Sequence, residues 1–233
     1  MLSKSGARTF FLVGTFVCAG AFILLTLDTL KRVPGQTREE NITAEVIRGK
    51  NLWEKNNCMG CHTILGEGAY YAPELTKVYD RRGIEFIRSL LKDPEAMYPE
   101  QRKMVKYNFT DSEISDLVAF FKWIGEMDLN GFPAKPPLAV TGNSLANSFG
   151  HAKMPIIYKN MCTSCHSLGG SGGNVGPALD VIGDKLNAEE IMKWLRDPMA
   201  LKADSKMPKL PLTEEQIAEL AGFLSQFKSG EKK

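Results

Sequence analysis

Residues 58–62 read Cys-Met-Gly-Cys-His, and residues 162–166 repeat the same spacing as Cys-Thr-Ser-Cys-His. Two cysteines three positions apart can each form a thioether to one vinyl group of a porphyrin, and the histidine that follows can then bind the iron. This C-x-x-C-H spacing is the attachment signature of a c-type haem. Its double occurrence predicts two covalently bound haem c groups, around which the rest of the chain must be organised.

Paired cysteines also occur in zinc sites, in disulfides and in redox-active dithiols, and these are the alternatives. The two pairs lie about a hundred residues apart, which suits a single zinc site of four thiolates poorly. A redox dithiol has no need of a histidine directly after each second cysteine. The residues predicted to attach haem and to bind its iron from the proximal side are Cys58, Cys61, His62, Cys162, Cys165 and His166.

Length and composition fit two small domains. A chain of 233 residues allows one or two, and two haem motifs favour two. The 29 Lys and Arg residues nearly balance the 27 Asp and Glu residues, and no basic stripe is present, so a nucleic-acid partner is not expected. Four of the five cysteines belong to the haem motifs, and the remaining Cys18 cannot form a disulfide framework alone.

An apolar run near the N-terminus predicts a membrane anchor. Residues 10–27 carry no charge and would span about 27 Å as a helix, close to the thickness of a bilayer core. The alternative is a cleaved signal peptide, since Lys4 and Arg8 precede the run and Ala19-Gly20-Ala21 resembles a cleavage site. That site lies inside the run, whereas cleavage normally follows it, so we predict a retained single-pass anchor over residues 1–33.

The charges beside the anchor do not orient it, because two basic residues precede it and two follow it. Haem is attached covalently on the outer face of the bacterial cytoplasmic membrane. The chain after about Leu30 is therefore predicted to lie in the periplasm. The expected location is the inner membrane, with both haem domains on its outer face.

The two haem motifs begin two copies of one pattern. Counting from the first cysteine, both copies have a proline at +15, an Asp-Pro pair ending at +36, a methionine at +46 or +45, and a threonine six residues after the methionine. Equal offsets over such a length predict equal geometry. The residues are Pro73 and Pro177, Asp93-Pro94 and Asp197-Pro198, Met104 and Met207, and Thr110 and Thr213.

Each copy has the pattern of a class I cytochrome c domain, in which short helices surround a haem that supplies much of the core. Thr110 with Glu113, and Thr213 with Gln216, predict capping boxes that open a terminal helix. The predicted fold class is all-α, with one transmembrane helix followed by two such domains. The apolar faces of the terminal helices comprise Ile114, Leu117, Val118, Phe121 and Ile124, and Ile217, Leu220, Ala221 and Leu224.

The first terminal helix needs a packing partner. A short helix before the first haem motif would present Val46, Gly49 and Trp53 on one side, and the glycine would let two helices cross closely. In the second copy Pro155 shortens the equivalent helix, and no glycine occupies the matching position. The domains are therefore predicted to be related but not identical.

The distal iron ligands are predicted to be methionines, which stabilise reduced iron and raise its potential. Met207 precedes Pro208 in a loop that cannot continue a helix, and Met104 occupies the same place in the first copy. Met97 is the competitor for the first site. An iron with histidine and methionine both bound has no open position, so we predict electron transfer and not substrate turnover.

The proximal histidines are predicted to be oriented from the segments at Pro73 and Pro177. A backbone carbonyl there can accept the imidazole N–H and fix the tautomer.

Between the copies, residues 131–153 read as a linker rich in Gly, Pro, Asn and Ser, with His151 as a solvated side chain. The predicted domains are an anchor at 1–33, a first cytochrome domain at 34–130, the linker at 131–153 and a second cytochrome domain at 154–233.

Four stretches carry a more specific pattern than the haem motif alone. They read Arg-Gly-Lys-Asn-Leu-Trp at 48–53, Asn-Cys-Met-Gly-Cys-His-Thr at 57–63, Leu-Gly-Glu-Gly-Ala-Tyr-Tyr-Ala-Pro-Glu-Leu at 65–75 and Asp-Leu-Asn-Gly at 128–131. With these stretches the chain from the anchor to about Pro133 resembles the cytochrome c subunit of nitric oxide reductase. The resemblance covers rather more than half of the chain.

In that family the cytochrome is membrane-anchored and carries one haem. It is bound to a multi-helix catalytic subunit that holds two b haems and a non-haem iron and reduces two nitric oxide molecules to nitrous oxide and water. The resemblance implies that His62 and Met104 ligate the electron-donating haem. It also implies that the backbone carbonyls of Gly68 and Tyr70 contribute to a calcium site shared with the catalytic subunit. A turn packed against the haem edge is the alternative for these two residues.

Two features depart from the family pattern. Val105 replaces the proline usual after the ligand methionine, and the family usually ends near Pro133, whereas this chain adds a second cytochrome domain. We therefore predict a membrane-anchored di-haem cytochrome c, not an enzyme by itself, that passes electrons to the nitric oxide reductase catalytic subunit. The second domain would receive them from a soluble cytochrome c or cupredoxin, or act as a tethered donor.

Other functions fit parts of the same pattern. The main alternative is the di-haem subunit of a haem-copper oxygen reductase, which also combines an anchor with two C-x-x-C-H domains. A di-haem peroxidase would require one five-coordinate iron. A gas sensor would require that nitric oxide displaces Met104.

Overall fold

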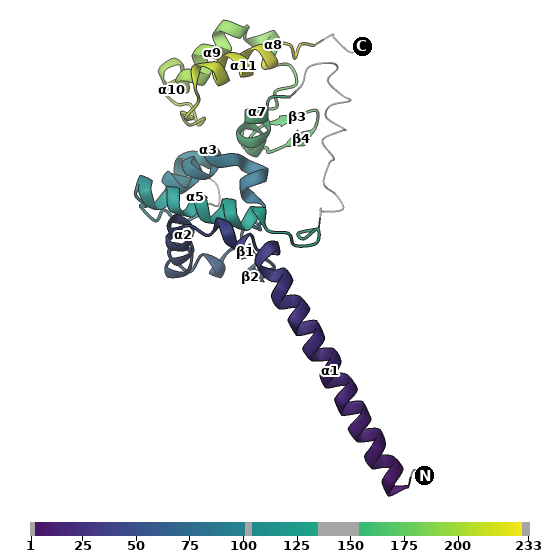
Figure 1. Cartoon of the computed structure of the whole chain (residues 1–233). Coiled ribbons are helices and arrows are strands. Elements are labelled where there is room, and N and C mark those ends of the chain that lie inside the picture. The colour runs from purple at the N-terminus through teal and green to yellow at the C-terminus, as the bar shows by residue number, and fades with distance from the viewer. Residues whose placement is uncertain (1–2, 101–103, 135–153, 230–233) are drawn as a thin grey trace.

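The computed structural model describes residues 3–100, 104–134 and 154–229. A long N-terminal helix leads into a first helical domain, and a second helical domain lies beyond it (Figure 1). The strands in the described ranges form two short antiparallel hairpins, β1 (Thr63–Ile64) with β2 (Glu67–Gly68) and β3 (Ser167–Leu168) with β4 (Ser171–Gly172). The predicted all-α class, with one long apolar helix at the start, is confirmed.

The N-terminal helix α1 (Lys4–Gln36) is 33 residues long and therefore spans about 50 Å. Ser3 caps its first turn by accepting the N–H of Gly6 at 3.1 Å. Its most apolar window has a mean hydropathy of 2.4, and none of that window is buried, so this helix is long and apolar enough to cross a membrane. The hydroxyls of Thr26 and Thr29 donate to carbonyls one turn back, which satisfies these two polar side chains within an apolar helix.

The end of α1 is joined to the first domain by hydrogen bonds. The N–H of Asp128 donates to the carbonyl of Gln36 at 2.9 Å, and the indole N–H of Trp123 donates to the carbonyl of Arg38 at 3.2 Å. The short helix η1 (Glu39–Asn41) adds a bond from the amide of Asn41 to Glu126, at 3.0 Å. The anchor therefore continues into the first domain at the C-terminal end of its last helix.

In the first domain, α2 (Ala44–Lys55) crosses α5 (Asp111–Glu126) at Gly49. A Cβ atom on this glycine would lie 2.1 Å from the carbonyl oxygen of Asp116, so the predicted close crossing is confirmed. Thr110 and Glu113 form the predicted capping box. The helices α3 (Val78–Lys92) and α4 (Pro94–Met97) complete the domain, and Gly83 interrupts α3 with a φ of 74°.

An ion pair between the buried Asp116 and the half-exposed Arg48 reinforces that crossing. Asp116 is 5 % exposed, and its two carboxylate oxygens accept the Nε–H and an Nη–H of Arg48 at 2.9 and 2.8 Å. A carboxylate buried without such a partner would be costly, so Arg48 is required where Asp116 is present. Sequence patterning had placed only apolar residues at this crossing.

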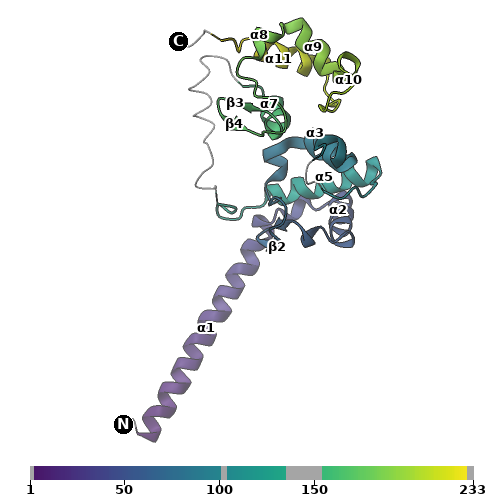
Figure 2. The same ribbon diagram turned by 180° about the vertical axis from the view of Figure 1, so that it is seen from behind.

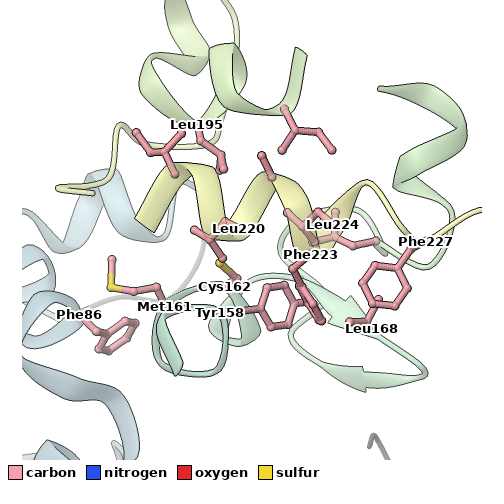
Figure 3. Packing of buried hydrophobic residues seen from close by; sticks show 14 of the residues in the cluster. Phe86, Tyr158, Met161, Cys162, Leu168, Leu195, Leu220, Phe223, Leu224 and Phe227 are labelled. Carbon is pink, nitrogen blue, oxygen red and sulfur yellow. The ribbon is translucent and has the colours of Figure 1, made fainter. Parts of the chain in front are cut away.

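The second domain repeats the plan with a shorter first helix. Pro155 precedes α7 (Ile156–Met161), as predicted, and η3 (Cys162–Ser164), α8 (Ile182–Lys185), α9 (Ala188–Arg196) and α10 (Pro198–Leu201) follow. The last helix, α11 (Glu214–Leu224), opens with the predicted capping box of Thr213 and Gln216. Leu220, Phe223 and Leu224 of α11 pack over Tyr158 and Cys162 (Figure 3).

The two domains touch along α3 and α7, and both views show these helices side by side (Figures 1 and 2). Most of the predicted linker, including His151, lies outside the described residues. Its described start, up to Ala134, follows the last helix of the first domain.

Candidate haem-binding sites

The first haem motif lies on η2 (Cys58–Gly60) and the turn after it. The N–H of His62 donates to the carbonyl of Cys58 at 2.9 Å, which holds the histidine one turn beyond the first cysteine. The β1–β2 hairpin then folds back over this turn. Gly68 has a φ of 117°, and a Cβ atom there would lie 2.2 Å from the carbonyl oxygen of His62, so only glycine fits.

Both proximal histidines are oriented by the prolines that the repeat identified. The Nδ1 atom of His62 lies 2.8 Å from the carbonyl oxygen of Pro73, and Nδ1 of His166 lies 2.8 Å from that of Pro177. A carbonyl only accepts, so each Nδ1 carries the proton and each Nε2 is left to bind a metal. The ring of His166 also rests on Gly176, where a Cβ atom would lie 2.4 Å from it.

An apolar cavity in the first domain contains both predicted iron ligands. His62 and Met104 line it together with Cys58, although many residues separate the histidine from the methionine. Met97 is absent from its lining and is instead buried in the cluster of the second domain, which favours Met104 over its competitor. The remaining lining residues are Trp53, Leu75, Val78, Phe86, Ile87, Leu90, Leu91, Tyr107, Phe109, Leu117 and Phe121.

These walls fit a haem. Among the described residues, none with a carboxylate, ammonium or guanidinium group lines the cavity, as expected where a large planar apolar group is to be bound. The indole N–H of Trp53, which lines the cavity, is buried and has no acceptor in the described part of the chain. A buried donor normally has a partner, so this N–H is left available to an acceptor that the described residues do not supply.

The environment of Cys58, Cys162 and Cys165 disfavours the thiolate form that a bound metal would need. Burial, with a smaller contribution from Cys61, raises the pKa of the Cys58 thiol to about 11. Burial likewise raises the pKa of Cys162 to about 12 and that of Cys165 above its usual value. A zinc site needs the thiolate form. The described residues also contain no group of three or more His, Cys, Asp and Glu side chains placed to hold a metal ion.

In the second domain, Met207 is half-buried and packs against the cluster that contains Cys162. The indole N–H of Trp194 in α9 lies 3.2 Å from the Sδ atom of Met207 and donates to it. This contact was not foreseen from the sequence, although the repeat offers a signal for it. Both Trp194 and Leu90 lie 32 residues after the first cysteine of their motif, so the first site has an aliphatic side chain at this position.

The predicted calcium ligands lie on the surface. Gly68 is exposed at the end of the hairpin, and Tyr70 is 85 % exposed. Calcium takes six to eight oxygen ligands, so two backbone carbonyls would form only part of its shell. Calcium binding therefore stays a prediction.

Comparison with known proteins separates the two domains. The cytochrome c family model matches residues 46–125, and the model described as cytochrome c oxidase, cbb3-type, subunit III matches residues 151–224. The two matches agree with two cytochrome c-type domains in an all-α chain.

Three relatives each match rather more than half of this chain and nearly all of their own length. The chain is 38 % identical over 136 residues to the nitric oxide reductase C subunit of Stutzerimonas stutzeri, which covers 56 % of this chain and 93 % of the relative. It is 38 % identical over 144 residues to the corresponding protein of Halomonas halodenitrificans, with 58 % and 96 % covered. For the corresponding protein of Paracoccus denitrificans the identity is 31 %, with 57 % and 95 % covered.

Proposed function

Because the chain belongs to the family of the nitric oxide reductase cytochrome c subunit, we propose that it is a di-haem cytochrome c that delivers electrons to the catalytic subunit of a membrane-bound nitric oxide reductase. It is the electron-transfer subunit of an oxidoreductase complex, and its cytochrome domains bind haem c covalently. The observation that carries the proposal is the repeated geometry of the two proximal histidines, each held by a proline carbonyl at 2.8 Å.

In the proposal, Cys58 and Cys61 attach the first haem, and His62 and Met104 ligate its iron. The second haem is attached by Cys162 and Cys165 and ligated by His166 and Met207. When bound, each haem would supply one-electron transfer, and a histidine and a methionine from the chain would be the iron ligands at each site.

The protein controls this chemistry through the surroundings of the two sites. The proline carbonyls accept the Nδ1–H of each imidazole and so fix the protonated nitrogen. They also make Nε2 a stronger electron-pair donor to a bound iron. The apolar walls of the first cavity exclude water and disfavour additional charge, which favours the reduced iron. Met104 and Met207, as soft thioether ligands, would also favour the reduced iron.

The length and apolar character of α1 support a membrane anchor. We propose that it crosses the cytoplasmic membrane and leaves both cytochrome domains in the periplasm, where haem is attached. The hydrogen bonds at Gln36 and Arg38 then hold the first domain directly above the membrane surface. That position suits a domain that delivers electrons to a membrane-embedded partner, with a calcium ion at Gly68 and Tyr70 as a further proposed contact.

The description of the second family model keeps one other function open. A di-haem subunit of a haem-copper oxygen reductase would also carry a domain like residues 151–224. The metal content of the complex separates the two, because a nitric oxide reductase requires non-haem iron where the oxygen reductase has copper.

Purification of the intact complex from membranes tests the proposal. A pyridine haemochrome assay should give two thioether-linked haems per chain, and metal analysis should give haem b and non-haem iron without copper. One haem c per chain would contradict the di-haem assignment. Copper in the complex would contradict the assignment of the catalytic partner.

A further inference from the structure

One helix borders both haem-binding regions. Phe86 of α3 is 5 % exposed and lines the cavity that holds His62 and Met104. The same side chain belongs to the hydrophobic cluster of the second domain, together with Met161 and Cys162. Figure 3 shows Phe86 entering this cluster beside Met161. Phe86 thus belongs both to the wall of the first site and to the cluster that contains Cys162 of the second motif.

A second residue of the first domain enters the same cluster. Met97, at the end of α4, is 5 % exposed and packs within the second domain. Its carbonyl oxygen lies 4.0 Å from the Sγ atom of Cys165. Cys165 of the second motif therefore lies against the first domain, and Cys162 shares a hydrophobic cluster with Phe86 and Met97.

The repeat provides an internal comparison for this position. Met97 and Leu201 both lie 39 residues after the first cysteine of their motif. Leu201 is 54 % exposed, whereas Met97 is covered. The second domain therefore covers the surface of the first domain around Met97. In the described part of the chain, nothing covers the equivalent surface of the second domain around Leu201.

Polar contacts surround the apolar centre. Arg82 places its guanidinium 5.1 Å from the centre of the Phe86 ring and donates to the hydroxyl of Thr163 at 3.5 Å. Lys206 forms an ion pair with Glu100 across the boundary between the domains. These contacts fix the relative orientation of the two domains more narrowly than apolar packing alone would.

The break in α3 makes the contact close. Gly83 has a φ of 74°, a conformation that favours glycine, and a Cβ atom there would lie 2.8 Å from the side-chain nitrogen of Asn160 in α7. A larger residue would have to displace the amide group of Asn160, and its positive φ would be strained whatever the space. Gly83 therefore lets α3 turn beside Asn160 of the second domain.

We infer that the contact of α3 and α4 with α7 and η3 is the route by which an electron crosses between the two sites, and that it holds the domains as one fixed unit. This inference rests on the proposed function. One electron is lost at one site and gained at the other, and no atom or proton is transferred. Electron tunnelling falls steeply with distance and is slower across water than across packed atoms, so a contact centred on Phe86 favours it.

A fixed unit differs from the tethered donor that the linker suggested. A swinging domain would meet its partner at an effective concentration set by linker length. Here the contact is already made, and two side chains of the first domain are buried in the core of the second. The rate of electron exchange should therefore depend on this contact and not on linker length.

The test uses the full-length haem-loaded chain in detergent, with Cys18 changed to serine. Ser112→Cys and Ala218→Cys, both at exposed positions, carry the spin labels. Pulsed electron paramagnetic resonance then gives the distance between the two labels and so between the domains. Met97→Glu places a charge in the contact, and Leu201→Glu is the matched control at the equivalent exposed position. Rapid photoreduction of one haem per chain gives the rate at which the electron redistributes between the sites.

We expect a narrow distance distribution for the parent chain and for Leu201→Glu. Met97→Glu should broaden the distribution and slow redistribution at least tenfold, with unchanged visible spectra at both sites. Met97→Leu should restore both readouts, because it retains the apolar contact. If Met97→Glu does not fold, Arg82→Glu serves instead, since Arg82 lies outside the cavity lining and its loss should slow redistribution to a smaller extent.

A broad distribution in the parent chain would overturn the inference. So would a redistribution rate that stays unchanged when the contact is opened, or a contact that neither substitution opens. Neither readout requires the catalytic subunit. A complex found to contain copper would therefore change the proposed function without affecting this result.

Discussion

The crossing of α2 and α5 can be tested by adding one methyl group, with Gly49→Ala. Carbon atoms in van der Waals contact lie about 3.5–4.0 Å apart. The new Cβ atom would lie 2.1 Å from the carbonyl oxygen of Asp116 and 2.8 Å from Cβ of Phe120. Backbone atoms cannot move aside independently, so the two helices must separate by roughly 1 Å.

Overpacking of this kind typically costs about 1–3 kcal/mol. Alanine in place of glycine inside a helix stabilises by about 0.5–1 kcal/mol, so the net destabilisation is about 1 kcal/mol at mid-range and up to about 2.5 kcal/mol. In a domain of this size a loss of about 1 kcal/mol lowers the melting temperature by about 4–8 °C. Trp53 would move with α2, so the cavity wall should loosen as well.

Gly222→Ala in α11 is the matched control. Nothing in the described structure lies within 4 Å of a Cβ atom at Gly222, so this substitution should leave the second domain unchanged or stabilise it by up to about 1 kcal/mol. The assay is amide hydrogen exchange of the haem-loaded chain, read separately for α5 and α11, together with a circular dichroism melt. Equal protection of the α5 amides in the parent chain and in Gly49→Ala would refute the reasoning.

Two further predictions concern the iron ligands. Met104→Ala should convert the first site from low-spin to high-spin in visible and electron paramagnetic resonance spectra, whereas Met97→Ala should leave that site low-spin; the reverse pattern would make Met97 the ligand. Trp194→Phe removes the N–H that Met207 accepts. That N–H draws electron density from the sulfur and favours reduced iron, so its loss should lower the potential of the second site. One neutral hydrogen bond of about 0.5–1.5 kcal/mol corresponds to roughly 20–65 mV in a spectroelectrochemical titration, while the first site, which has Leu90 at this position, should not shift.

The direct contact between the domains changes what the second domain can contribute. A donor held only by a flexible linker would add local concentration. A donor packed on α3 adds a defined orientation, because Arg82 and Glu100 pair with residues of the second domain around the buried Phe86 and Met97. With haem at both sites, the chain would be a rigid pair of electron-transfer domains and not a cytochrome with a second domain joined only by a flexible linker.

Many of these features could be predicted because they are local in the chain. A capping box and a proline-shortened helix each depend on residues within a few positions, so the roles predicted for Thr110, Pro155 and Thr213 are confirmed. The equal offsets of the two copies extended this to Pro73 and Pro177, whose carbonyls do accept from the histidines. Even the crossing at Gly49 could be predicted from a single small residue on an apolar helix face.

What the sequence could not supply were the partners of residues far apart in the chain. Arg48 with Asp116, Trp194 with Met207 and Phe86 with the second-domain cluster are contacts between elements, and no periodicity encodes them. Met97 shows the reason most clearly. Its repeat counterpart Leu201 is an apolar residue at the same offset, yet one is buried and the other exposed. Only the docking of one domain on the other distinguishes them, because burial is a property of the assembled surfaces and not of the residue or its neighbours in sequence.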